Sequence, residues 1–227
     1  MTCASLASGP DATGDRPAPP PPPPDAAAAL GALGRDIAAC RICAPRFAAT
    51  RTAHRPRPVV RLSATARLLI AGQAPGARVH ASGLPFDDRS GDRLRDWMGI
   101  GRETFYDAAR IAILPMGFCF PGYDAKGSDL PPPPVCAATW RARALAAMPQ
   151  VELTLLVGGH AQVWAMGRGA MGRGATVTGR VAAWRDAPPG AIPLPHPSWR
   201  NTGWLKRNPW FEEELLPWLR ARVEALT

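Results

Sequence analysis

Four short apolar runs separated by helix-like segments are the feature of this chain that most limits its fold. The runs cover residues 68–70, 111–114, 153–157 and 192–194. The segments between them, around residues 92–97, 137–148 and 161–166, have the spacing of helices. Such alternation is typical of a parallel sheet with helices on its faces. We therefore expect an α/β fold with three layers, α/β/α, around a four-stranded, mainly parallel sheet.

A distinctive loop follows each apolar run. The loops are Gly-Gln-Ala-Pro-Gly at 72–76, Pro-Met-Gly-Phe-Cys at 115–119, Gly-Gly-His-Ala-Gln at 158–162 and Pro-His-Pro-Ser-Trp-Arg-Asn at 195–201. Parallel strands end at one edge of the sheet, where ligands of such folds bind. In the first loop, Gly72, Pro75 and Gly76 leave backbone N–H groups free to approach a ligand or phosphate. An ordinary strand-to-loop connection is the alternative.

The sequence predicts different structures for the two ends of the chain. Residues 1–27 are rich in Ala, Gly, Asp and Pro and are expected to form a disordered tail, which leaves residues 28–227 as one domain. A helix is plausible from Ala26 to Cys40. The last helix is expected to begin at Asn208-Pro209. Its buried stripe would consist of Phe211, Leu215, Trp218 and Leu219.

The charge of the chain favours a polyanionic partner. Lys and Arg number 27 against 18 Asp and Glu, which gives a formal net charge of +9. Clustered cations of this kind exchange counterions with phosphate. No stretch reaches the ~18 apolar residues that a membrane helix requires. We expect no membrane association, a cytoplasmic, nucleoid-associated location and a monomer.

The cysteines indicate a metal or redox site rather than disulfides. The chain has five, of which Cys3 lies in the tail. Cys40 and Cys43 form a C-x-x-C pair, and Cys119 and Cys136 form a more distant pair. Four thiolates can hold tetrahedral zinc or a 4Fe-4S cluster, and the spacing alone leaves both open.

His196 is the strongest single candidate for a catalytic residue. It lies between two prolines after an apolar run, which presents the imidazole at a loop. A structural or solvated histidine is the alternative. Nearby, Ser198 and Arg200 could hold phosphates, and Trp199 or Arg200 could fill a gap in a base stack.

Together these motifs resemble the two signatures of the uracil-DNA glycosylase superfamily. The first comprises Gly72-Gln73-Ala74-Pro75-Gly76, Gly83-Leu84-Pro85-Phe86 and Asp88-Arg89-Ser90-Gly91, and the second is His196-Pro197-Ser198. The spacer of residues 77–82 has the length found in the iron-sulfur branch. The four cysteines are also similar to that branch, so the resemblance implies a structural 4Fe-4S cluster, with zinc as the alternative.

The resemblance implies a role for each matching residue. Gly72, Gln73, Ala74, Pro75, Gly76 and Pro115 would line the base, Phe86 would stack on it, and His196 and Gln73 would take part in catalysis. His196 would hydrogen-bond the charge that develops on the base oxygen. Asp88 would stabilise the sugar cation or orient water. Asp87 is its rival, and a turn aspartate bonding its own backbone is the alternative.

The implied substrate is uracil-containing DNA, single- or double-stranded. Excision requires the nucleotide to be turned out of the duplex. The resemblance places the wedge at Trp199 and Arg200. Further DNA contacts are expected from Ser198, Asn201, Lys206 and Arg207.

Several departures from the family pattern bear on which base the protein would remove. Gln73 replaces the usual Glu, and Pro115 occupies the position of an Asn that reads uracil. His80 could compensate from the spacer, although an exposed loop histidine is the plainer interpretation, and His160 receives no role. The alternatives are a glycosylase for hypoxanthine or xanthine, a non-catalytic binder of damaged or abasic DNA, and a small-molecule nucleotide binder.

Overall fold

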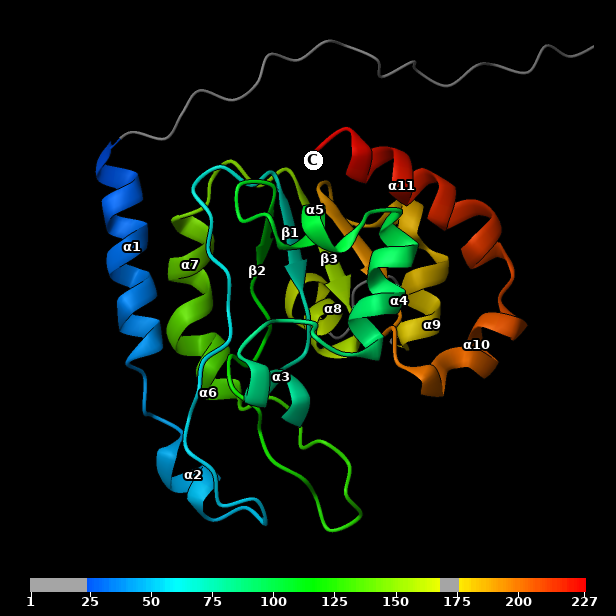
Figure 1. Cartoon of the computed structure of the whole chain (residues 1–227). Helices are drawn as coiled ribbons and strands as arrows, with labels where there is room; N and C mark the ends of the chain where they lie inside the picture. Colours follow the sequence, from blue (N-terminus) through cyan, green and yellow to red (C-terminus); the bar gives the residue numbers. More distant parts are fainter. Residues whose placement is uncertain (1–23, 168–175) are drawn as a thin grey trace, which may run out of the picture.

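A four-stranded parallel sheet forms the centre of the molecule (Figure 1). The computed structural model describes residues 24–167 and 176–227. The strands are β1 (Leu68–Ala71), β2 (Ile111–Ile113), β3 (Leu153–Val157) and β4 (Ala191–Leu194), in the order β2-β1-β3-β4. All three strand pairs are parallel, and Arg61 adds an isolated antiparallel bridge to Ile113 on β2. The predicted strands and their parallel arrangement are confirmed.

The strands are apolar throughout because both faces of the sheet are covered. Successive side chains of a strand point to opposite faces. In β1, Leu68 and Ile70 join one hydrophobic cluster, Leu69 joins a second and Ala71 a third. All four are fully buried. Burial on both faces is the usual condition of a parallel strand.

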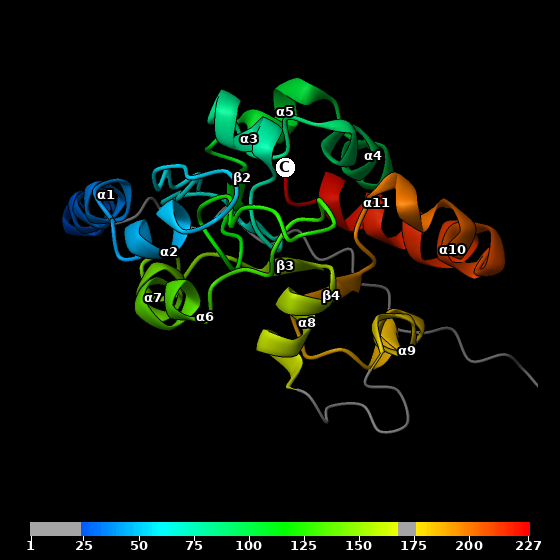
Figure 2. The same ribbon diagram turned by 90° about the horizontal axis from the view of Figure 1, so that it is seen from below.

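Helices cover both faces and complete the predicted three layers (Figure 2). The first face packs against α4 (Arg89–Met98), α5 (Arg102–Tyr106), the π-helical turn η4 (Phe211–Leu215) and α11 (Leu216–Glu224). The second face packs against α1 (Pro24–Ala38), α6 (Pro134–Cys136), the π-helical turn η1 (Ala137–Arg141), α7 (Ala142–Ala146) and α8 (Gly159–Met166).

The remaining short elements connect these layers. They are α2 (Ala44–Ala48), α3 (Ala77–Ser82), α9 (Val177–Ala182), η2 (Trp184–Asp186), η3 (Trp199–Asn201) and α10 (Thr202–Arg207). Helix α9 packs beside β4. Helix α3 follows β1 and η3 follows β4, so both lie near the carboxyl ends of the strands, where the loops of interest converge (Figure 1).

Local sequence signals fix both ends of α4. Asp88 is its N-cap, and Oδ1 of Asp88 accepts a 2.8 Å hydrogen bond from the backbone N–H of Gly91. Gly99 ends the helix with a left-handed φ of +69°. The predicted helix around residues 92–97 is therefore present and is longer than predicted.

Two expectations about the ends of the chain require correction. Helix α1 begins at Pro24, inside the predicted tail, whereas residues 1–23 lie outside the described residues. In the last helix, Phe211, Leu215 and Leu219 are buried as predicted, but Trp218 is 36% exposed and Leu216 and Val223 are buried instead. The wider π-helical turn η4 shifts which later side chains face the core. Among the described helices, none has the length and apolar character needed to cross a membrane.

Candidate active site and nucleic-acid interface

The predicted base-binding residues line one pocket at the carboxyl end of the sheet. The lining of this pocket includes Gly72, Gln73, Ala74, Pro75, Gly76, Phe86 and Pro115, together with Asp88 and His196. These residues come from loops after β1, β2 and β4, which end at the same edge of the sheet. The structure thus brings the residues of both sequence motifs into one site.

Phe86 is held against the pocket by two glycines and an aromatic neighbour. A β-carbon at Gly72 would lie 3.1 Å from Cζ of Phe86, and one at Gly91 would lie 1.8 Å from the Phe86 carbonyl oxygen. The ring of Phe86 meets Phe105 edge-on, with 6.0 Å between centroids. Phe86 also has a left-handed φ of +55°, which is uncommon outside glycine. The surrounding chain therefore fixes the aromatic face of the pocket.

Gln73 presents its carboxamide beside the turn that follows β3. A β-carbon at Gly158 would lie 2.6 Å from Nε2 of Gln73, and Gly158 has a φ of +85°. Both conditions require glycine at this turn. The Gln73 side chain has no hydrogen-bond partner within the described ranges. Its amide is therefore available both to donate to a ligand and to accept from it.

Pro115 lines the pocket with its ring, and its carbonyl is already engaged. Nη1 of Arg141 donates to the carbonyl oxygens of Leu114 at 2.6 Å and Pro115 at 3.3 Å. Arg141 is fully buried, and burial lowers its pKa to about 10. The guanidinium also lies over the Trp164 ring, 4.4 Å from its centroid. The end of β2 thus offers the pocket an apolar ring rather than a polar side chain.

His196 is oriented by the loop that follows it. The backbone N–H of Ser198 donates to Nδ1 of His196 at 3.2 Å, and Nδ2 of Asn201 donates to the His196 carbonyl oxygen at 2.7 Å. Burial lowers the pKa of His196, and the nearby Asp88 carboxylate partly opposes this shift. Burial, the larger effect, favours a neutral imidazole, and the hydrogen bond from Ser198 to Nδ1 leaves Nε2 as the protonated nitrogen.

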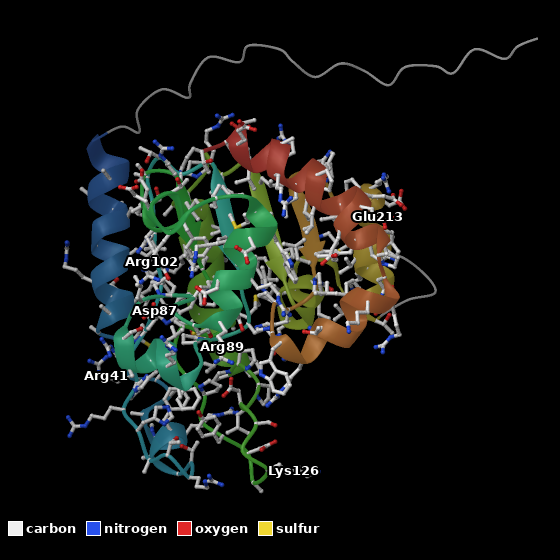
Figure 3. The ribbon with its side chains drawn as sticks, turned by 45° about the vertical axis from the view of Figure 1, so that its right-hand side comes forward. Arg41, Asp87, Arg89, Arg102, Lys126 and Glu213 are labelled. Atoms are coloured by element: carbon white, nitrogen blue, oxygen red, sulfur yellow. The ribbon has the colours of Figure 1, made fainter. Side chains whose placement is uncertain are left out.

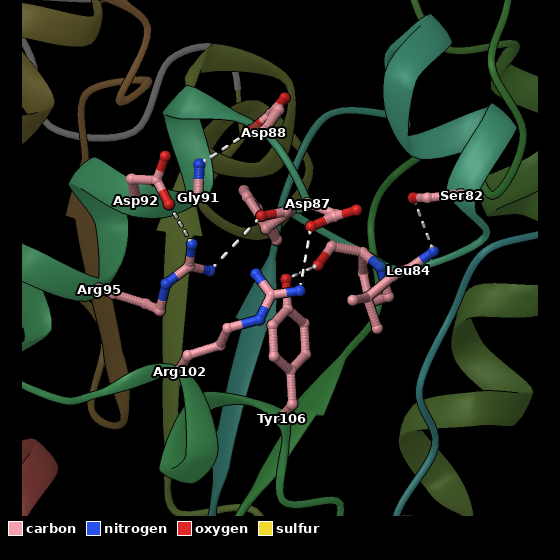
Figure 4. Close-up of polar contacts among 11 residues, drawn as sticks. Ser82, Leu84, Asp87, Asp88, Gly91, Asp92, Arg95, Arg102 and Tyr106 are labelled. Atoms are coloured by element: carbon pink, nitrogen blue, oxygen red, sulfur yellow. Dashed lines mark hydrogen bonds and ion pairs between the residues drawn. The ribbon is translucent and has the colours of Figure 1, made fainter.

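The structure separates the two candidate aspartates. Asp88 lines the pocket, whereas Asp87 does not. Asp87 forms an ion pair with Nη2 of Arg102 at 3.1 Å, and this hydrogen bond lowers the pKa of the Asp87 carboxyl (Figure 4). Asp88 uses Oδ1 to cap α4, as the turn alternative expected, while its carboxylate still faces the pocket. Of the two, only Asp88 lines the pocket.

A wider groove opens from the mouth of this pocket. The residues shared by pocket and groove are Gln73, Ala74, Gly76, Asp88, Ser90 and His196. Ser198, Trp199, Arg200 and Asn201 form one wall, and Arg78 and Arg89 add positive charge. Arg89, at the start of α4, faces the same end of the molecule as Lys126 on the loop after β2 (Figure 3). Positive charge beside a deep pocket suits a phosphate backbone.

Trp199 is the most exposed large apolar side chain of the groove. It is 68% exposed, and the Arg200 guanidinium lies 5.9 Å from its ring centroid. Nη1 of Arg93, on α4, donates to the Ser198 carbonyl oxygen at 3.0 Å and anchors this wall. Lys206 and Arg207, also expected to contact DNA, lie in the last turn of α10 and do not line the groove.

The four predicted cysteine ligands line a second cavity. Cys40, Cys43, Cys119 and Cys136 are free thiols, and the backbone N–H of Phe118 donates to Sγ of Cys136 at 3.3 Å. Burial raises the pKa of Cys119 to about 12 and that of Cys136 to about 11. A bound cation would oppose this effect of burial by stabilising the thiolates.

The cysteines are not arranged around a single ion. Among the described residues, no three His, Cys, Asp or Glu side chains form a group that could hold one metal ion. Zinc would require four sulfurs at ~2.3 Å from one point. A cluster instead distributes its cysteine ligands over separate iron atoms. All four thiols line the one cavity.

His80 lies outside the pocket, in a neighbouring aromatic cluster. The centroid of its ring lies 5.2 Å from the ring centroid of His54 and 5.9 Å from that of Phe120. Burial, His54 and Arg57 all lower the pKa of His80. His80 therefore does not line the pocket and cannot compensate there for the lack of a polar side chain at Pro115.

Sequence reasoning missed several residues of the site. Val59, Val79 and Ile113 complete the pocket together with Pro85 and Ser90, which belong to the first motif but received no role there. Tyr123, Gly127, Ser128 and Asp129 line the groove. The apolar residues carry no chemical signal of their own. The groove residues belong to the stretch between Cys119 and Cys136, and its position between two candidate ligands was the available clue.

The fold and the site define a class of protein. A parallel sheet carries, beyond the carboxyl ends of its strands, a pocket lined by Gln73, Phe86 and His196. The pocket opens into a groove lined by arginines and an exposed tryptophan. The family model described as the uracil DNA glycosylase superfamily matches residues 59–220. The chain belongs to this superfamily, as its motifs predicted, and is at this level a DNA glycosylase of base excision repair. The match begins after Cys40 and Cys43 and leaves the iron-sulfur branch a prediction.

Proposed function

We propose that this protein excises uracil from DNA by hydrolysing the N-glycosidic bond and leaves an abasic site. The observation that carries the proposal is the convergence of Gln73, Phe86, Asp88 and His196 on one pocket beneath a basic groove. In this set, Gln73 hydrogen-bonds the edge of the base and Phe86 stacks on its face. Asp88 supplies a carboxylate and His196 a hydrogen-bond donor. A protein that only bound abasic DNA would have no need of a donor and a carboxylate inside this pocket.

Recognition of the base rests on Phe86 and Gln73. The ring of Phe86, fixed by Gly72 and Phe105, stacks on the face of the base. The Gln73 carboxamide can accept from a ring N–H and donate to a carbonyl oxygen, the pair of groups along one edge of uracil. Its place beside Gly158 keeps the amide at the pocket wall.

His196 supports bond cleavage by donating to the departing base. Because Nδ1 accepts from Ser198, the neutral imidazole presents Nε2–H toward the pocket. Negative charge grows on the base oxygen as the glycosidic bond lengthens. A preorganised donor at such an oxygen contributes about 3 kcal/mol to lowering the barrier. The Asp88 carboxylate contributes negative charge that stabilises the oxocarbenium-like sugar.

The groove supplies what nucleotide flipping requires. Turning a base out of the stack costs a few kcal/mol, less at a mismatch. Trp199 is exposed and can fill the vacated space. Arg78, Arg89 and Arg200 lie around the pocket mouth to bind the flanking phosphates.

A different deaminated base is the second candidate. The observation that favours it is Pro115, whose ring lines the pocket where a uracil-reading amide is expected and whose carbonyl is held by Arg141. Because no polar side chain after β2 hydrogen-bonds the base, the pocket discriminates less strongly against hypoxanthine and xanthine. Gln73 is then the main source of base selectivity.

The cysteine cavity is proposed to hold a 4Fe-4S cluster through Cys40, Cys43, Cys119 and Cys136. The four thiols share one cavity and are not grouped around one ion. The cluster would serve as a structural tie between the end of α1 and the stretch 119–136. Broad visible absorbance and about four irons in anaerobically purified protein would support it, whereas colourless protein with one zinc would contradict it.

Oligonucleotides that each contain one uracil, hypoxanthine or xanthine test the proposal. Incubation is followed by alkali, which cleaves at abasic sites. The proposal predicts cleavage at uracil, and preferential cleavage at a purine would favour the second candidate. No cleavage of any substrate, together with tight binding to abasic DNA, would overturn the enzymatic proposal.

A further inference from the structure

The stretch between Cys119 and Cys136 forms an ordered hairpin-like loop at the groove. Tyr123 and Asp129 make an antiparallel bridge, and the backbone N–H of Leu130 donates to the Gly122 carbonyl oxygen at 2.9 Å. Oδ1 of Asp124 accepts from the backbone N–H groups of Lys126 and Ser128, both at 2.8 Å. These bonds give the loop a defined shape. We call residues 122–130 the groove hairpin (Figure 3).

The groove hairpin places one carboxylate at the mouth of the base pocket. Asp129 lines the groove with Asp88 and His196. Oδ2 of Asp129 lies 3.7 Å from the position that a β-carbon would take on Gly76, a residue that lines both pocket and groove. Because Gly76 has no side chain, nothing from that residue stands between the carboxylate and the pocket rim.

Among the carboxylates of this region, Asp129 differs in that neither side-chain oxygen accepts a hydrogen bond from a described residue. Asp88 caps α4, Asp87 pairs with Arg102, and Asp124 closes the hairpin turn. The Asp129 side chain accepts no hydrogen bond from any residue in the described ranges. Its charged neighbours across the groove are Arg200 and Asp88. Partial burial raises the pKa of Asp129, as expected of a group that accepts protons.

We propose that Asp129 is a catalytic residue that binds the attacking water and accepts its proton. The inference rests on the proposed glycosylase function and extends it. Asp88, with one oxygen fixed by Gly91, supplies charge from the pocket side. Asp129 approaches from the open side of the groove, where water has access to the sugar.

The reaction balances with water as the only co-reactant. The bond between the sugar C1′ and the base nitrogen breaks, and its electron pair leaves with the base, whose oxygen is held by His196. The water oxygen forms a new bond to C1′. One water proton passes to the Asp129 carboxylate and then to solvent, and the base anion takes a proton from solvent.

Single-turnover excision by Asp129→Asn tests the proposal, with Asp87→Asn as the matched control. Both substitutions are isosteric, and Asp87 lies outside pocket and groove. Asp129→Asn should slow excision by roughly 10²-fold, the contribution of a general base. It should bind abasic DNA as tightly as the wild type or more tightly, because a negative charge facing phosphates is removed. Excision within twofold of wild type would overturn the proposal.

A binding measurement separates this proposal from the glycosylase assignment. Duplexes that contain either a cationic pyrrolidine or a neutral tetrahydrofuran in place of the target nucleotide serve as probes. The wild type should prefer the cationic probe, and Asp129→Asn should lose roughly tenfold of that preference. An unchanged preference would overturn the role of Asp129, whatever the turnover. Failure of the wild type to excise any base would instead overturn the glycosylase assignment while this binding comparison still reports on Asp129.

Discussion

The backbone N–H of Ser198 donates to Nδ1 of His196 at 3.2 Å and so determines which imidazole nitrogen carries the proton. Since Nδ1 accepts, Nε2 is the protonated nitrogen of the neutral ring. Burial lowers the pKa of His196 and keeps the ring neutral near pH 7. The pocket is therefore lined by a neutral imidazole that carries its proton on Nε2, held by the Pro-His-Pro-Ser loop.

Replacing His196 with alanine should mainly affect the chemical step. Loss of one preorganised donor is expected to cut single-turnover excision by roughly 10² to 10³ while affinity for abasic DNA is retained. The matched control is His160→Ala, because His160 is exposed on α8 and lines neither pocket nor groove. Equal rates for the two variants would show that the site is placed wrongly.

Mild acidification should lower the stability of the protein. Burial lowers the pKa values of His80 and His196 below the unfolded value of about 6.5. The unfolded state then binds more protons in this range, so the free energy of unfolding falls as the pH drops. This contribution is fully present above pH ~6.5 and is lost as the pH falls through the folded pKa values.

Thermal unfolding between about pH 7.5 and pH 6 measures this effect, above the range in which the carboxylates titrate. The melting temperature of the wild type should decrease with acidification. A double variant, His80→Gln with His196→Gln, should show a shallower decrease. A wild-type melting temperature that rises over this interval would contradict the burial of these two rings.

Gly91 should be far less tolerant of a methyl group than Gly101. A β-carbon at Gly91 would lie 1.8 Å from the Phe86 carbonyl oxygen, whereas at Gly101 nothing lies within 4 Å. Both residues lie near the start of a helix. Gly91→Ala should destabilise the protein by about 3 kcal/mol, and Gly101→Ala should change stability by less than about 0.5 kcal/mol. Urea unfolding midpoints that coincide for the two variants would refute the predicted close approach to Phe86.

Trp199 should contribute to DNA binding rather than to stability. It is 68% exposed at the groove, so its removal leaves no cavity in the core. Trp199→Ala should weaken binding to abasic duplex by about 1 to 3 kcal/mol, the range for a stacking aromatic. Trp218→Ala, on α11, is the control and should leave DNA affinity unchanged. Unaltered affinity of Trp199→Ala in a fluorescence anisotropy titration would exclude the wedge role.

The fold could be predicted because its signals are local. Apolar runs that are buried on both faces distinguish the strands, and Asp88 and Gly99 cap α4 where the chain suggests a helix. Trp218 was predicted wrongly because the π-helical turn η4 changes the helical register, and such a turn leaves no clear mark in apolar spacing. The site motifs could be located because Gly, Pro and His collect at the strand ends.

The residues that the sequence did not reveal act through long-range contacts. Arg141 reads as an ordinary surface arginine, yet it is buried and holds the carbonyl of Pro115. Asp129 lies in a polar loop that resembles any other, and only the hairpin brings it to Gly76. The different roles of Asp87 and Asp88 likewise depend on Arg102, the first residue of α5, which pairs with Asp87.

The most direct test of the central claim is single-turnover excision from a duplex with one uracil, at enzyme concentrations that saturate the DNA. The pocket of Gln73, Phe86, Asp88 and His196 predicts an alkali-labile site at the uracil for the wild type. The His196→Ala variant should form the same site roughly 10² to 10³ times more slowly. A uracil strand that stays intact with saturating wild-type protein would contradict the assignment of this pocket as a uracil-excising active site.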